Sequence, residues 1–378
     1  MNKQPLYLDN SATTKPVSTI PEAILPYITD YWHNPSSTYS QGKRVREKIE
    51  EVREQTAKLI GAKPNEIYFT SGAAESNNWA LQGWSKANNH QPVITSAIEH
   101  KSVKECAFWA TTNRIVYPNE HGEITGSELK EVYKSLYWAT TSLVSIMAAN
   151  NEIGTVNNIK ELADITHWNH GCFHTDATQY LAYNPINVKD MDIDMLSASA
   201  QKLGGFKGTG FLYIKEGIEV SPLIYGAQEN EMRGGTENVI GIVALGEAIT
   251  QIDYGIPQQM SIWREKFINR LILEGCKLNG FKDKNTLPSI ISVVLPYGIS
   301  SEAFILTMES AGIIISGGSA CNANSPESSY VLKAIGLTDE QAGSTIRITL
   351  PKTKDLAEQT YIIDRFMAEF KKAVELLR

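Results

Sequence analysis

The 378-residue sequence is poor in cysteine, in long apolar stretches and in clustered basic charge. Its 4 cysteines lie far apart without a CxxC pair, which argues against a zinc site and against a disulfide framework. No apolar run reaches the roughly 18 residues that a membrane span needs, and the opening MNKQPLYLDN lacks the apolar core of a signal peptide. A net charge of -7 with no basic block argues against a protein that mainly binds nucleic acid. We therefore expect a cytoplasmic protein with no direct contact to membrane or nucleic acid.

Short apolar runs alternate with helical patterns through the first two thirds of the chain. Strands are expected at 66–70, 93–96, 114–117, 142–148, 171–175, 194–197 and 210–214, and helices at 39–60, 100–112, 126–137 and 158–169. This alternation predicts a mainly parallel α/β sheet, which binds ligands at the carboxyl ends of its strands.

The pattern changes after about residue 250, and the first 40 residues differ again. Helices are expected at 258–279, 301–312 and the C-terminus, and strands at 290–295, 313–316 and 345–349. This composition predicts a smaller α+β domain. Residues 1–40 are punctuated by 5 prolines and are expected to be irregular.

One lysine stands out by its surroundings, in DIDMLSASAQKLGGFKGTG at 192–210. Met195 and Leu196 are expected to end a buried strand, and Lys202 follows among small residues, where the backbone approaches another group closely. One interpretation is an exposed lysine in a surface turn. A Walker phosphate loop does not fit, because the pattern GxxxxGK(S/T) is not met. The third interpretation is a Schiff base with pyridoxal phosphate (PLP), which requires an acid for the pyridine nitrogen, a stacking ring and phosphate donors.

Candidates for these groups follow the expected strands one after another. Asp176, in HTDATQ, suits the pyridine nitrogen, and Gln179 can donate to the ring oxygen. His100, in AIEHKSV, can stack on the ring and transfer protons near neutral pH. The turn at 71–78, SGAAESNN, offers backbone N–H groups for a phosphate, and Asn151 follows a further strand. Taken singly, each of these residues has an ordinary structural interpretation. Because all of them follow expected strands around one lysine, the set favours a PLP site.

Two further side chains are unusual where they stand. Cys321 lies in SGGSACNANSPESS, whose small and polar residues predict an exposed, flexible loop with a thiol accessible as a nucleophile. The other cysteines fall in or beside helix and strand patterns and fit buried structural roles. Arg347 lies among isoleucines in STIRITL, where a substrate carboxylate or a structural Asp or Glu would satisfy it equally.

Together these segments resemble the cysteine desulfurases, the NifS/IscS-like group of PLP enzymes with the class V aminotransferase fold. The resemblance is carried over nearly the whole chain by LDNSATT, NPSS, TSGAAESNN, EHKSV, ANNEIG, HTDATQ, SASAQK, RGGTEN, SGGSAC and STIRITL. It implies the fold type I PLP-transferase architecture, with a large PLP-binding domain at 15–250. Residues 1–14 and 251–378 would form a small α+β domain that carries the Cys321 loop.

The resemblance also implies the reaction and the residues that perform it. L-Cysteine is converted to L-alanine, and sulfur passes as a Cys321 persulfide to an acceptor protein for iron–sulfur cluster assembly or tRNA thiolation. The catalytic residues implied are the sulfur-accepting Cys321, the Schiff-base Lys202 and the stacking acid/base His100. The cofactor would be bound by Asp176 at the pyridine nitrogen, by Gln179 and Asn151 at the ring-oxygen side, and at the phosphate by Ser199 and backbone groups of Ala73 and Ala74. Thr236 would reach the phosphate of the neighbouring subunit, which implies a homodimer, and the substrate would be bound by Asn34, Asn151 and Arg347.

Two positions depart from the family pattern. Ala74 stands where the family usually has Thr, and Gln201 stands where it usually has His before the lysine. Both residues border the expected cofactor site, so PLP is expected to bind more loosely than in relatives. Selenocysteine lyase, or another PLP lyase or transaminase, is the alternative activity, and a non-catalytic scaffold homologue is the alternative from another class. The sequence after Cys321 also departs from the usual one, which leaves the acceptor open.

Overall fold

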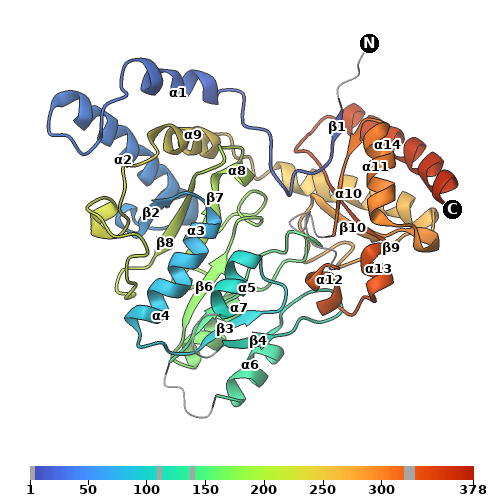
Figure 1. Cartoon of the computed structure of the whole chain (residues 1–378), viewed down its shortest axis with the longest axis horizontal. Coiled ribbons are helices and arrows are strands. Elements are labelled where there is room, and N and C mark those ends of the chain that lie inside the picture. The colour runs from blue at the N-terminus through green and yellow to red at the C-terminus, as the bar shows by residue number, and fades with distance from the viewer. Residues whose placement is uncertain (1–4, 109–112, 137–140, 319–327) are drawn as a thin grey trace.

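The computed structural model describes residues 5–108, 113–136, 141–318 and 328–378. Cys321 lies outside the described residues. Within the described ranges, no helix combines the length and the apolar character needed to cross a membrane. The ribbon has two unequal parts, each built around its own sheet (Figure 1).

The larger part is built on a seven-stranded sheet in the order β2-β8-β7-β6-β5-β3-β4. From β7 to β4 the neighbouring strands are parallel, whereas β8 is antiparallel to both β7 and β2. The bounds are β2 Ile67–Thr70, β3 Val93–Ser96, β4 Asn113–Val116, β5 Leu143–Ser145, β6 Cys172–Asp176, β7 Met195–Ser199 and β8 Gly210–Ile214. The expected mainly parallel α/β sheet is confirmed.

Helices cover both faces of this sheet, because successive side chains of its buried strands point to opposite sides. In β8, Leu212 packs in one apolar cluster with Trp79 and Trp84, whereas Phe211 packs in another with Val52. A π-helical turn, η2 Trp79–Gly83, joins α3 to α4. The helices are α1 Ile20–Thr29, α2 Ser40–Ile60, α3 Ala73–Asn78, α4 Trp84–Ala87, α5 Lys101–Phe108, α6 Gly126–Lys134, α7 Ile159–Trp168, α8 Ala200–Leu203 and α9 Val239–Thr250, with 3-10 turns η1 Pro64–Glu66 and η3 Glu229–Glu231.

The smaller part is a four-stranded antiparallel sheet in the order β12-β13-β10-β9, packed with helices. Its elements are α10 Ile256–Leu273, β9 Lys277–Leu278, β10 Ile290–Val294, η4 Pro296–Gly298, α11 Ser301–Ser310, β12 Ser316–Gly317, α12 Tyr330–Ala334, α13 Asp339–Gly343, β13 Thr345–Thr349 and α14 Leu356–Leu377. Near the N-terminus, β1 Leu6–Tyr7 pairs in parallel with β11 Ile313–Ile314. The domain boundaries at residues 14 and 250 stay a prediction.

Several expectations about secondary structure were wrong. The helix expected at 258–279 ends at Leu273, and Lys277–Leu278 forms the strand β9 instead. The strand expected at 142–148 is shorter, because β5 spans only Leu143–Ser145.

The first 40 residues contain α1 and β1, because Pro21 occupies the first turn of α1, where its missing N–H costs no hydrogen bond. The expected strand at 313–316 is two strands, since β11 pairs with β1 and β12 with β13. Met195 begins β7 rather than ending it. The small polar residues after it remain in the buried strand, where the Ser197 hydroxyl is hydrogen-bonded to His174 Nε2 at 2.9 Å.

Candidate active site

The carboxyl ends of the parallel strands meet at one edge of the large sheet, and the segments that follow them form the candidate site. Asp176 ends β6 and lies opposite Ser197 of β7. Lys202 lies on α8, which continues directly from β7. Since β3 and β5 end at the same edge, the loops after them bring His100 and Asn151 to this side of the sheet.

A chain of hydrogen bonds joins Asp176 to His100. Asn77 Nδ2 donates to Asp176 Oδ2 at 2.7 Å and to Ser102 Oγ at 2.9 Å. The Ser102 hydroxyl also lies 2.8 Å from His100 Nδ1. The second Asp176 oxygen accepts the backbone N–H of Thr178 at 2.9 Å. Asn77 and Ser102 lie in the segments SGAAESNN and EHKSV, but no pattern in the sequence distinguishes these two side chains from their neighbours.

The N-terminal LDNSATT segment connects Lys202 with Gln179. Lys202 Nζ donates to the backbone carbonyl of Ser11 at 2.6 Å and to that of the next residue. Gln179 Nε2 donates to the same Ser11 carbonyl at 3.1 Å. Gln201 also contacts this segment, because its side-chain oxygen accepts a hydrogen bond from Thr13 Oγ1 at 3.4 Å. Ser11 is therefore a shared anchor that sequence reasoning missed.

A glycine-lined turn lies beside Ser199. Gly72, the N-cap of α3, has φ 146° and ψ 176°, a conformation that other residues rarely adopt. A Cβ at Gly210 would lie 2.7 Å from the Gly72 Cα, so this close approach of two chain segments requires glycine. A Cβ at Gly72 would lie 3.9 Å from the Ser199 hydroxyl. Ala73 and Ala74 form the first turn of α3, where backbone N–H groups have no partner within the helix and suit an anion.

Arg347 is buried, with a side chain only 2% exposed. Its Nη2 donates to Asp9 Oδ1 and to Ser316 Oγ, both at 2.8 Å, and its Nη1 donates to the Asn151 carbonyl at 2.9 Å. Its Nε is buried without a partner among the described residues. The sequence left open whether Arg347 meets a substrate carboxylate or a structural one, and Asp9 provides the structural carboxylate.

The arrangement fits a PLP-type cofactor. The Asp176 side chain is buried, and in the described part of the chain its oxygens accept hydrogen bonds only from neutral groups. A buried carboxylate is stabilised by a cation, and a protonated pyridine nitrogen is one. The Lys202 amine, the imidazole of His100 and the turn at Gly72 supply the attachment, stacking and phosphate groups that such a cofactor requires.

Three buried titratable side chains border this network. Burial raises the pKa of Glu99 to about 8 and that of Glu152 to about 7. Burial lowers the pKa of His174 to about 4, so its imidazole, held between the hydroxyls of Ser145 and Ser197, is neutral near pH 7. Glu99 lies in the segment EHKSV and Glu152 in the segment ANNEIG, but the sequence pattern assigned neither glutamate a role.

Among the described residues, Asn34 and Thr236 have no hydrogen bond to the network. Asn34 is exposed, and its side chain accepts the backbone N–H of Ser36 at 2.8 Å. Thr236 is exposed and lines a hollow together with Ser71, which precedes the Gly72 turn, and Arg233. Cys321 lies outside the described residues. The roles predicted for all three stay predictions.

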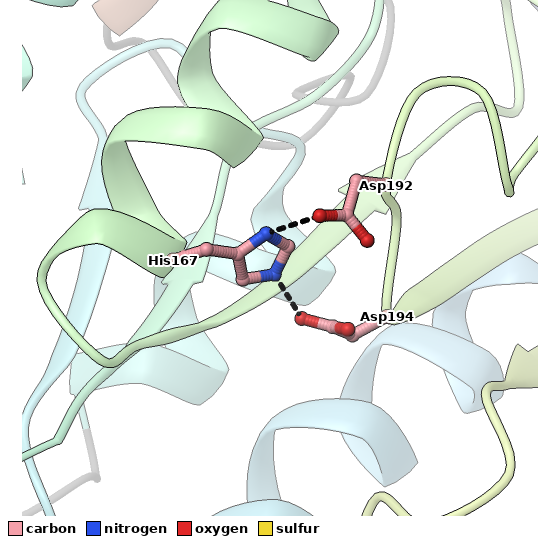
Figure 2. A group of neighbouring side chains, drawn as sticks. All are labelled: His167, Asp192 and Asp194. Atoms are coloured by element: carbon pink, nitrogen blue, oxygen red, sulfur yellow. Dashed lines mark hydrogen bonds and ion pairs between the residues drawn. The ribbon is translucent and has the colours of Figure 1, made fainter.

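A second cluster of titratable groups lies at the opposite edge of the sheet, before the starts of β6 and β7 (Figure 2). His167 Nε2 is 2.7 Å from Asp194 Oδ2, and its Nδ1 is 2.9 Å from Asp192 Oδ2. Lys215 Nζ also pairs with both carboxylates, at 2.9 and 3.3 Å. Two carboxylates therefore face one lysine and one imidazole, and the hydrogen bond to Asp194 raises the pKa of His167. The group acts as an ionic tie between strand ends.

Comparison with known proteins places these features in a family. Residues 6–355 match the family described as Aminotransferase class-V. The chain is 38% identical to the cysteine desulfurase IscS of Methanosarcina thermophila over 384 aligned positions, which cover 99% of this chain and 93% of that protein. Among solved structures, a NifS-like protein superposes with a TM-score of 0.88 at 30% identity, covering 98% of this chain and 100% of the other. The structure of SspA in complex with cysteine superposes with a TM-score of 0.81 at 33% identity, covering 93% and 100%.

Proposed function

The chain belongs to the class-V aminotransferase family, among the cysteine desulfurases, and from this premise we propose that it converts L-cysteine to L-alanine with PLP as cofactor. The observation that carries the proposal is the network at the strand ends, which joins Asp176 to His100 and lies next to Lys202 and its Ser11 anchor. The alternative interpretation of Lys202 as a lone surface lysine accounts for none of these contacts.

Each residue of the network has a role in this proposal. Lys202 holds the cofactor and moves the proton at the substrate Cα. Bound PLP supplies an electron sink for the electron pair left at that carbon. Asp176 holds the proton on the pyridine nitrogen, and His100 stacks on the ring and exchanges a proton with the substrate thiol. Gln179 contacts the ring-oxygen side, where the proposal also places Asn151.

The remaining cofactor and substrate contacts belong to the same proposal. The phosphate is bound by Ser199, by the backbone of Ala73 and Ala74, and across a homodimer by Thr236. Asn34 and Arg347 bind the substrate carboxylate. Support for the arginine comes from its bond to the carbonyl of Asn151, which follows β5 at the site, and Thr236 is exposed, so a second copy of the chain can contact it.

Sulfur transfer is assigned to Cys321. Its thiolate attacks the substrate sulfur, the bond between that sulfur and Cβ breaks, and the electron pair stays with the carbon, which is protonated to give alanine. The persulfide on Cys321 then passes its sulfur to an acceptor protein, either an iron–sulfur scaffold or a tRNA-thiolation enzyme, in the cytoplasm.

The test begins with the holo-protein and L-cysteine. We expect a visible absorption band from bound cofactor, formation of alanine and sulfide, and one added sulfur on the Cys321 peptide by mass spectrometry. Cys321→Ser should keep the absorption band but form no persulfide and little alanine, because a serine hydroxyl stays protonated near neutral pH. Formation of a keto acid would identify a transaminase, and a strong preference for selenocysteine over cysteine would identify a selenocysteine lyase. A wild-type protein without the cofactor absorption band would support the scaffold alternative.

A further inference from the structure

The imidazole of His100 has two nitrogens, and in the neutral ring only one of them carries a proton. The proposed reaction has His100 exchange a proton with the substrate thiol, but it leaves open which nitrogen holds that proton. The answer decides whether the ring donates or accepts at Nε2, the nitrogen farther from the backbone. It depends on the hydrogen bonds that the other nitrogen, Nδ1, makes with its neighbours.

The backbone at the start of α5 gives the first constraint on Nδ1. The N–H of Ser102 donates to His100 Nδ1 at 3.2 Å. The His100 carbonyl accepts the N–H groups of Val103 at 2.9 Å and of Lys104 at 3.0 Å, so His100 lies at the N-terminal end of this helix. A backbone N–H is always a donor. Nδ1 therefore presents a lone pair to it, because a proton on Nδ1 would be directed at the Ser102 N–H.

The side chains give a second, independent constraint, which begins at Asp176. A carboxylate only accepts hydrogen bonds, so it fixes the Asn77 amide with Nδ2 toward Asp176 Oδ2, at 2.7 Å. The same Nδ2 donates its other hydrogen to Ser102 Oγ at 2.9 Å. Ser102 Oγ accepts there, and its own hydrogen can point to His100 Nδ1, 2.8 Å away. This direction agrees with that of the backbone N–H, so both constraints make Nδ1 an acceptor.

We propose that Ser102 is a positioning residue, which uses its backbone N–H and its hydroxyl group to hold neutral His100 with the proton on Nε2. The inference deepens the proposed function and rests on it for what this proton does. A protonated Nε2 has no lone pair to take up the proton of the substrate thiol. It can donate a hydrogen bond to the substrate sulfur, and such a donor favours the thiolate form of that sulfur.

The first measurement determines the tautomer directly. The chain has 7 histidines, and the signal of His100 is the one that the variant His100→Gln lacks. Nitrogen-15 NMR of the histidine-labelled holoenzyme and apo-protein at about pH 8.5, well above the ordinary histidine pKa of about 6.5, separates protonated from unprotonated ring nitrogens. We expect a protonated Nε2 and an unprotonated, hydrogen-bonded Nδ1 in both forms.

Two variants of Ser102 test the role of its hydroxyl group. Ser102→Ala removes this donor to Nδ1 and keeps the backbone N–H, whereas Ser102→Thr keeps a hydroxyl group. The matched control is Ser85→Ala, because the Ser85 hydroxyl also lies beside a histidine, 3.2 Å from His90 Nδ1, but on α4 and outside the network.

We expect Ser102→Ala to move the Nδ1 resonance of His100 toward that of a nitrogen without a hydrogen bond. It should also lower kcat/KM about fivefold, the effect of losing one hydrogen bond between neutral groups. Ser102→Thr should restore both values, and Ser85→Ala should change neither. A purely structural role of Ser102 would leave the Nδ1 resonance in place.

Replacing the ring itself tests whether Nε2 acts as a donor. His100→Gln places an amide group at the position of Nε2, whereas His100→Asn places one only at the position of Nδ1. The glutamine variant should keep at least about tenfold more activity than the asparagine variant, because a hydrogen bond to a charged group is a strong one. If His100 instead took up the thiol proton as a base, both variants would lose that function equally.

Three results would overturn the inference: a protonated Nδ1 in the wild type, a wild-type Nδ1 resonance in Ser102→Ala, or equal activity of His100→Gln and His100→Asn. The proposed function fails differently, since a wild-type holoenzyme that makes no alanine from cysteine would refute it. The NMR measurements need no turnover, so in that case they still decide which nitrogen of His100 carries the proton.

Discussion

Glu229 and Arg53 form a buried ion pair that should dominate the stability of the segment carrying Thr236. Arg53 on α2 donates to both carboxylate oxygens of Glu229, at 2.7 and 2.9 Å, and the two side chains are 10% and 2% exposed. Glu229 also accepts the N–H of Phe69 in β2 at 3.0 Å. Four residues further on, Arg233 pairs with Glu75 at 2.8 Å, so the segment is tied twice to the region of β2 and α3.

Replacing Glu229 with Gln removes the charge and leaves the guanidinium buried. Breaking one partner of a buried pair costs about 3–5 kcal/mol, because the remaining charge stays desolvated. In this variant Arg53 keeps an ion pair with the half-exposed Glu50 at 3.0 Å. We therefore expect the free energy of unfolding to fall by about 3 kcal/mol, at the lower end of that range. A typical domain has a total stability of about 5–15 kcal/mol, so this loss is readily measurable.

The assay is urea unfolding of the apo-protein, followed by tryptophan fluorescence. Glu216→Gln is the control, because it removes an exposed ion pair with Lys63 and should leave the unfolding midpoint unchanged. The double variant Arg53→Met with Glu229→Leu should recover more than half of the loss, since no charge is then left buried. A loss below about 1 kcal/mol for Glu229→Gln would refute the reasoning that desolvation governs this pair.

Three further predictions concern the cofactor site and the second charge cluster. Lys202→Ala should abolish the cofactor adduct that borohydride reduces, and retention of that adduct at wild-type stoichiometry would identify another lysine. Ala74→Thr with Gln201→His should tighten PLP binding to the apo-protein by adding phosphate donors, whereas unchanged affinity would mean that the phosphate is bound differently. The hydrogen bond to Asp194 raises the pKa of His167, so its contribution to stability is present below the unfolded value of about 6.5 and is lost as pH rises through the folded value. His167→Gln should therefore reduce the loss of stability above about pH 6.5, and an unchanged pH profile would contradict this.

Much of the large sheet was predictable because its pattern is local. The runs that became β3 and β8 have the bounds expected from their apolar residues. Each is short, buried and followed by a turn, and these features lie within a few neighbouring residues. The candidate site followed from the same logic, since parallel strands bring the residues after them to one edge.

What could not be predicted depends on pairing between distant segments. The boundary between β11 and β12 falls inside a continuous apolar run, and only their different partners, β1 and β13, separate them. The helix α1 was missed because its prolines were read as punctuation, although one occupies a first turn, where it is tolerated.

The sequence by itself determined the order of the strands along the chain, the polar groups that follow them and the family. These depend on the types and spacing of neighbouring residues. Only the tertiary structure shows three hydrogen bonds: from Lys202 to the Ser11 carbonyl, from Arg347 to Asp9, and from Ser329 to Glu152. Those contacts join residues 177 to 338 positions apart, and a distance in the fold follows from the packing of whole elements, which no local pattern specifies.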